Sequence, residues 1–281
     1  MALAKILAVV TLVSLTLGAG LQVDRDHLRA ILKNIGLLGR ALLANFVIVP
    51  LLGVLIAKVF RLPGPIATGF LLMAIAPGVP FVLAQVRKRG GSLGFAVALA
   101  FFLPLLSIVT VPITADLVLP TAAKAQLPMA RFVMTLVLFQ LVPLLVGIIA
   151  GGTWPTAAAK LARWLQIVFF ATAILLVVSL MPTIARDVGI IFGSGGMWAA
   201  FCLVILSLGS GWLLAGPRRE DRRVLAIGTG LRNIGLGALI ATSSFGRPEV
   251  AAMVIAYFLI QFIVVSIVGV YFTRTAEKAP A

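Results

Sequence analysis

Apolar residues fill most of the chain in long runs, separated by short segments in which polar and charged residues gather. Nine such runs can be distinguished, each close to the roughly 20 residues that a bilayer-spanning helix needs. They lie at about 3–21, 35–57, 65–86, 92–114, 129–152, 161–182, 196–215, 224–245 and 250–273. The pattern predicts an all-α polytopic membrane protein with about nine transmembrane helices, in one domain that spans residues 1–281.

The third run carries residues that interrupt a helix near its middle. Its segment AIAPGVPFVLAQV (74–86) contains Pro77, Gly78 and Pro80. Proline removes a helical N–H group and clashes with the preceding turn. Because the freed carbonyls need partners at membrane depth, we expect this segment to lie against protein or a watery cavity.

The eighth run is interrupted in a different way, by glycine and by polar side chains. Within GTGLRNIG (228–235), Thr229, Arg232 and Asn233 stand among glycines. We expect a helix crossover at this segment and the third run, formed by Gly228, Gly230, Gly235 and Pro80. At a rise of 1.5 Å per residue from the start of the run, Arg232 lies about 12 Å into the span, close to the membrane midplane.

The two interrupted runs are five spans apart and point in opposite directions across the membrane. Two discontinuous helices in corresponding, oppositely directed positions are typical of a transporter built from an inverted repeat. We therefore expect the segments near 76–80 and 228–235 to cross each other inside the helical bundle.

Composition and charge fit a membrane protein and exclude a nucleic-acid module. The 281 residues are 62% hydrophobic and 11% charged, far from the roughly 25% charged residues of a soluble domain. The net charge of +15 follows the membrane: with the N-terminus outside, inner segments hold fourteen lysines and arginines and outer segments seven. This predicts an N-terminus outside and a cytoplasmic C-terminus, and we expect the membrane to be a bacterial inner (plasma) membrane.

The first run has a second interpretation. MALAKILAVVTLVSLTLGAG has a lysine, an apolar stretch and small residues where a signal peptidase could cut. Cleavage would leave the mature N-terminus outside, on the wrong side for the basic segment 22–34. We expect a first transmembrane helix, and cleavage of this segment stays open.

No constellation of residues indicates an enzyme or a metal centre. The eight acidic residues fall in loops or at helix ends, the one histidine, His27, lies in a cytoplasmic segment, and Cys202 is the one cysteine. No cluster has metal-ligand spacing, and no serine has an evident base partner at membrane depth. We expect no cofactor and no catalytic residues.

The order and spacing of three segments resemble the bile acid:sodium symporter family over nearly the whole chain. They are LTLGAGLQVDRDHLRAILKN (15–34), FVIVPLLGVLIAKVFRLPGPIATGFLLMAIAPG (46–78) and GTGLRNIGLGALIA (228–241). The resemblance implies a core of spans about 35–114 and 196–273 beside a panel of spans about 3–21 and 129–182. It also implies two crossing discontinuous helices, and transport of organic anions with sodium.

The chain departs from the family where sodium binds. The family's crossover glutamate, a sodium ligand, aligns with Gly228, and its glutamine aligns with Arg232; its serine–asparagine pair falls on Val82 and Leu83. Because sodium prefers several oxygen ligands, we expect coupling to sodium by the family's mechanism to be lost. Arg232 could supply permanently the positive charge that bound sodium supplies elsewhere in the family, or it could meet an anionic substrate. Alternatively, its side chain could extend towards the cytoplasm and join Arg222 and Arg223.

Three functions of different classes follow as hypotheses. The first is a secondary transporter of small organic anions, the second a transporter-derived binding or sensing protein without turnover, and the third an intramembrane enzyme, against which the missing acidic site counts. Oligomeric state is not predicted. We expect a polar substrate cavity lined by Arg232, Asn233, Thr229, Pro77, Gly78 and Gln85, with Gln261 and Asn45 as further candidates.

Overall fold

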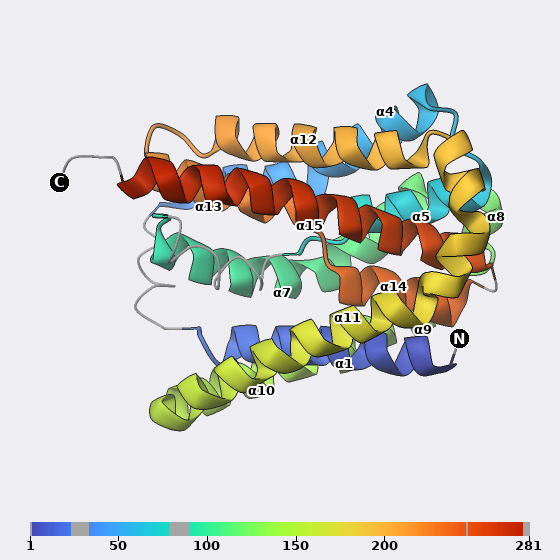
Figure 1. Ribbon diagram of the computed structural model, residues 1–281. Coiled ribbons are helices and arrows are strands. Elements are labelled where there is room, and N and C mark those ends of the chain that lie inside the picture. Colours follow the sequence, from blue (N-terminus) through green and yellow to red (C-terminus); the bar gives the residue numbers. More distant parts are fainter. Residues whose placement is uncertain (1, 24–33, 79–89, 246, 278–281) are drawn as a thin grey trace.

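The computed structural model describes residues 2–23, 34–78, 90–245 and 247–277, and this part of the chain is helical without a named strand. The long helices run side by side along one common direction, and the longest, α11, crosses them obliquely (Figure 1). Their bounds are α1 (Ala2–Gly20), α3 (Ile35–Leu43), α4 (Val49–Val59), α5 (Gly64–Ile75), α7 (Leu93–Val118), α8 (Thr121–Lys124), α9 (Met129–Leu136), α10 (Val142–Thr153), α11 (Pro155–Gly193), α12 (Gly196–Leu214), α13 (Arg219–Gly230), α14 (Ile234–Ser244) and α15 (Pro248–Glu277). The predicted all-α polytopic class is confirmed.

Seven helical stretches of the described chain are long and apolar enough to cross a bilayer. They coincide with seven of the nine predicted runs: Ala2–Gly20, Ile35–Val59, Leu93–Val118, Met129–Thr153, Pro155–Pro182, Gly196–Leu214 and Pro248–Ala276. In the described part of the third run and in the eighth run the apolar helices are shorter, Gly64–Ile75 and Ile234–Ser244, because the backbone is not helical at 76–78 and 231–233. The count of nine spans stays a prediction.

Two spans contain a turn of π-helix where a proline follows. The π-helical turns are η1 (Ala44–Ile48), between α3 and α4, and η3 (Val137–Leu141), between α9 and α10. Each leads into a Val-Pro pair, with Pro50 and Pro143 in the first turn of the next helix. A proline ring would clash with the carbonyl four residues earlier, and a locally widened helix relieves that clash.

α11 is much longer than the predicted span of 161–182. It begins at Pro155, where a missing N–H group is harmless in the first turn, and continues past Pro182 to Gly193. Its apolar portion fits the predicted span, but hydropathy does not show where a helix ends once it has left the membrane. The helix packs along α1 and also contacts α10, α12 and α15.

Helices α1, α10 and α11 pack against one another at one edge of the bundle, and α4 and α12 lie at the opposite edge (Figure 1). Glycines bring α1 and α10 into backbone contact, since a Cβ atom at Gly20 would lie 2.3 Å from the carbonyl oxygen of Leu144. The α1 segment is thus an integral part of the packed structure. The division into panel and core units within the domain stays a prediction.

Candidate functional site

The two broken helices meet at a crossover near the middle of the bundle. α5 ends at Ile75 and α13 at Gly230, and the extended segments that follow each of them pair at Pro77 and Arg232 as an isolated antiparallel bridge. The backbone N–H of Asn233 donates to the carbonyl oxygen of Ala76 at 3.0 Å. The predicted crossing of the two discontinuous segments is confirmed.

Close approach at the crossover requires glycine at position 78. A Cβ atom there would lie 2.4 Å from the carbonyl carbon of Arg232 and 2.6 Å from the backbone nitrogen of Asn233. Both are backbone atoms, so no side chain could rotate away to make room. Gly78 therefore lets the two backbone segments of the crossover contact each other directly.

Gln261 of α15 fastens the crossover from a third helix. Its Oε1 accepts from the backbone N–H of Arg232 at 2.8 Å, and its Nε2 donates to the carbonyl oxygen of Arg232 at 3.0 Å. The side chain is 1% exposed. Because an extended residue has no helical partner for its backbone groups, this amide replaces the two hydrogen bonds that the helix break removes.

Asn233 starts the second half of the broken helix. Its Oδ1 accepts from the backbone N–H of Leu236 at 3.0 Å, the usual geometry of an N-cap residue. The N-terminus of α14, which carries a partial positive charge, thus lies at the crossover.

The Arg232 side chain remains inside the protein, with 2% of its surface exposed. Its Nη2 donates to the carbonyl oxygen of Thr229 at 2.8 Å, in the last turn of α13. A cation at this position complements the partial negative charge of a helix C-terminus. The alternative in which the side chain reaches Arg222 and Arg223 does not describe this structure, because the buried guanidinium is bonded to Thr229, three residues earlier in the chain.

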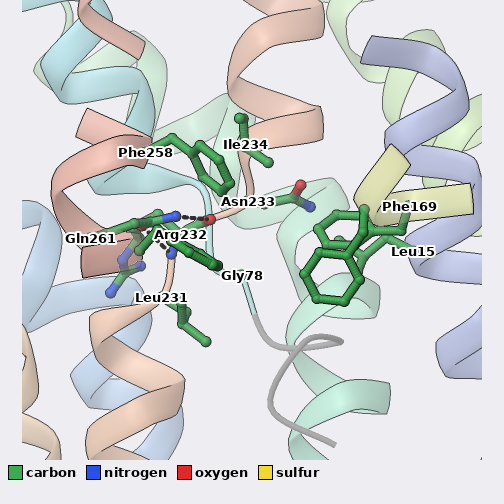
Figure 2. A pocket seen from close by; sticks show the side chains of 11 residues that line it. Leu15, Gly78, Phe169, Leu231, Arg232, Asn233, Ile234, Phe258 and Gln261 are labelled. Atoms are coloured by element: carbon green, nitrogen blue, oxygen red, sulfur yellow. Dashed lines mark hydrogen bonds between the residues drawn. The ribbon is translucent and has the colours of Figure 1, made fainter. Parts of the chain in front are cut away.

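A cavity of about 30 Å³ lies between the crossover and the helices α1 and α11 (Figure 2). It is lined by Leu15, Gly78, Phe169, Phe170, Leu231, Arg232, Asn233, Ile234, Phe258, Gln261 and Phe262. Since one water needs roughly 10–15 Å³ of such volume, the cavity has room for about two water molecules.

The structure brings some of the predicted site residues together and places others elsewhere. Arg232, Asn233, Gly78 and Gln261 line one cavity, whereas Thr229 turns its Oγ1 to the carbonyl oxygen of Ser207 at 2.7 Å. Pro77 lies in the bridge, and Asn45 is buried in η1, where its Nδ2 donates to the carbonyl oxygen of Ala41. Gly228 and Gly230 are helical in α13, and Gly235 lies in the first turn of α14. Gln85 and Pro80 lie outside the described residues. The assignment of these residues to a substrate site stays a prediction.

Sequence reasoning missed the apolar side of the cavity and one buried phenol. Leu15 and the four phenylalanines give no signal, because apolar residues fill these spans all round. Tyr257 could have been found from its position one helical turn before Gln261. Its hydroxyl is fully buried and has no hydrogen-bond partner in the part of the chain that the structure describes.

The described ranges contain no group of three or more His, Cys, Asp or Glu side chains able to hold a metal ion. Four carboxylates there have described side chains, Asp116, Glu220, Asp221 and Glu249, and all lie towards helix ends. Any cation at the crossover would depend on backbone carbonyls and neutral side chains. The expectation of no cofactor stays a prediction.

Comparison with known proteins gives a family. The Sodium Bile acid symporter family model matches residues 9–188. The chain is 25% identical over 245 residues to the probable sodium/metabolite cotransporter BASS2, chloroplastic, of Oryza sativa subsp. japonica, an alignment that covers 84% of this chain and 57% of the rice protein. It is 27% identical over 237 residues to the uncharacterized sodium-dependent transporter YocS of Bacillus subtilis (strain 168), covering 81% of this chain and 71% of that protein. This chain thus spans little more than half the length of its rice relative. Since the family model covers more than half of the chain, and apolar helices dominate its structure, this integral membrane protein belongs to the sodium bile acid symporter family.

Proposed function

We propose that the protein is a secondary transporter of small organic anions whose transport does not depend on sodium. Membership of a transporter family supports the general activity, and the relatives' names describe sodium-dependent transport by those proteins. The departure from sodium rests on this chain's own residues at the crossover. We also place the protein in a bacterial plasma membrane, with the N-terminus outside and the C-terminus in the cytoplasm, on the distribution of its lysines and arginines.

The observation that carries the proposal is the position of the Arg232 guanidinium. In discontinuous-helix transporters, coupling cations bind at unwound carbonyls and at half-helix C-termini. Here the guanidinium donates to Thr229 in the last turn of the half-helix α13, so a covalently attached cation occupies that electrostatic position. The family's crossover glutamate aligns with Gly228 in this chain, so no carboxylate at that position would balance the charge of an additional sodium ion. This substitution also supports transport that does not depend on sodium.

Energetics then favour exchange or export over accumulation. Arginine keeps its proton under ordinary conditions, so Arg232 cannot carry a proton across the membrane. For an anion that moves alone, an inside-negative potential favours exit by about 2.3 kcal/mol per charge for each 100 mV. Uniport or exchange of one anion for another is therefore the expected mode.

The test is uptake of radiolabelled carboxylates by proteoliposomes that contain the purified protein. A set of small monocarboxylates is offered with either sodium or potassium outside, with and without a second carboxylate inside. We expect uptake that is equal in the two salts and faster with internal counter-substrate. Uptake that rises with a sodium gradient and vanishes in potassium would contradict the proposal.

A matched pair of variants separates the role of the buried arginine from a general effect of charge. Arg232→Ala should abolish uptake, whereas Arg219→Ala, at an exposed position in the first turn of the same helix, should leave it unchanged. Undiminished uptake by Arg232→Ala would exclude this side chain from the mechanism. If the wild type binds carboxylates without moving them, the protein is instead a transporter-derived binding or sensing protein.

A further inference from the structure

The Arg232 guanidinium has unused hydrogen-bond donors in a place where water has little access. Nη2 donates to Thr229, but the buried Nε and Nη1 have no hydrogen-bond partner among the residues that the structure describes. Among the described residues no carboxylate lies against the guanidinium. A buried charge is stable only when it is paired, and arginine cannot escape by losing its proton.

Helix α15 carries a second unpartnered group near the crossover. The side chain of Tyr257 in α15 is completely buried and packs edge-on against Phe70, and within the described ranges its hydroxyl has no hydrogen-bond partner. Tyr257 lies one turn before Gln261, whose amide holds the backbone of Arg232, so the same face of α15 presents both side chains to the crossover.

These groups form a set of donors without an acceptor. The guanidinium offers N–H groups at Nε and Nη1, and the phenol offers an O–H group. Guanidinium edges bind planar or spherical anions through charge-assisted hydrogen bonds, which are stronger than neutral ones. Water could accept from these groups, but it would leave the positive charge of the core uncompensated.

We propose that Arg232 and Tyr257 form a buried binding site for one monovalent anion in the core of the crossover. The anion has two possible sources, a free inorganic ion such as chloride or the carboxylate of the transported substrate. Figure 2 shows the guanidinium nitrogens on the far side of the pocket from Leu15 and Phe169, so this site is set apart from the apolar wall of the cavity. The carboxylate alternative rests on the proposed transport function, whereas the free-ion alternative does not.

The experiment measures anion binding to the purified protein in sodium-free detergent solution, without requiring transport. Thermal unfolding is followed while chloride or acetate replaces a bulky reference anion, isethionate, at constant ionic strength. We expect a saturable rise in the unfolding temperature. A rise with chloride but not acetate identifies a free ion, a rise with acetate alone identifies a carboxylate, and competing effects of both identify a site for any small monovalent anion.

Variants locate the effect at the proposed residues. Tyr257→Phe removes one oxygen atom and should weaken the apparent affinity about tenfold or more, since it deletes a hydrogen bond to an ion. Arg232→Gln should abolish the saturable rise. Tyr271→Phe, at an exposed position in the same helix, is the matched control and should bind as the wild type does.

Two results would overturn the proposal. One is an unfolding temperature that does not respond saturably to either anion in the wild type. The other is an anion response that persists unchanged in Tyr257→Phe and Arg232→Gln, because the anion would then bind elsewhere. If Arg232→Gln does not fold, Tyr257→Phe decides alone. Failure of transport in liposomes would leave this binding result intact, so the two proposals fail separately.

Discussion

Replacing Gly78 by alanine tests whether direct backbone contact holds the crossover together. The added methyl group would lie 2.4 Å from the carbonyl carbon of Arg232, 2.6 Å from the backbone nitrogen of Asn233 and 2.7 Å from the Cα atom of Arg232. Ordinary van der Waals contact begins at about 3.5 Å between such atoms. The two backbone segments must therefore separate by about 1 Å.

That separation has a calculable effect on stability. The hydrogen bond from Asn233 to Ala76 is 3.0 Å long, and an increase of about 1 Å breaks it by geometric criteria. Steric crowding in a packed interior costs about 1–3 kcal/mol, and a lost hydrogen bond adds about 1 kcal/mol. We expect Gly78→Ala to reduce the free energy of unfolding by about 2–4 kcal/mol in total.

The assay is thermal unfolding in detergent, combined with uptake by proteoliposomes at a temperature where the variant remains folded. Gly209→Ala in α12 is the control, because a Cβ atom there meets nothing within 4 Å and alanine favours a helix. Gly78→Ala should lower the unfolding temperature and uptake, and Gly209→Ala neither. A Gly78→Ala protein as stable and as active as the wild type would refute the reasoning.

Three further substitutions give separate tests by thermal unfolding. Gln261→Leu leaves the backbone N–H and carbonyl of Arg232 buried without partners and should reduce the free energy of unfolding by about 2–5 kcal/mol. Gln261→Glu should have an intermediate effect, and equal stability of the two variants would contradict the double hydrogen bond. Gly235→Val inserts a side chain 2.9 Å from the Leu12 backbone in α1, and should lower stability by about 1–3 kcal/mol; a normal unfolding temperature would show that the α1–α14 contact is loose. Burial raises the pKa of the Asp221 carboxyl above its usual 3.8, so the folded protein binds this proton more tightly and loses stability as the pH rises through that range. Asp221→Asn should remove this loss, and an unchanged pH profile of the unfolding temperature would disprove it.

Much of the fold could be predicted because membrane spans and helix interruptions leave strong local signals. Pro77 and Gly78 mark one break, and the glycines around Arg232 mark the other; the structure confirms that the two segments cross. The precise second break lies at 231–233, after Gly228 and Gly230, because Asn233 caps the helix that follows. Glycine indicated where a helix could weaken, and the capping side chain marks where the next helix begins.

Other features could not be predicted from one sequence. The α11 helix extends beyond both ends of its predicted span, since hydropathy reports only the part that matches the bilayer. The aromatic wall of the cavity combines Phe169 of α11 with Phe258 of α15, residues far apart in the chain. In a helix that is apolar on every side, no periodic contrast shows which face meets a neighbour, and packing alone makes that choice.

The crossover is joined by main-chain atoms and by one amide from outside it. Ala76, Arg232 and Asn233 take part in that joint through backbone groups that every amino acid except proline possesses in full. Backbone atoms therefore hold the two segments of the crossover together, and a side chain sets the charge there. A substitution at position 232 would therefore change the charge at the crossover while the backbone atoms that join its two segments stay the same.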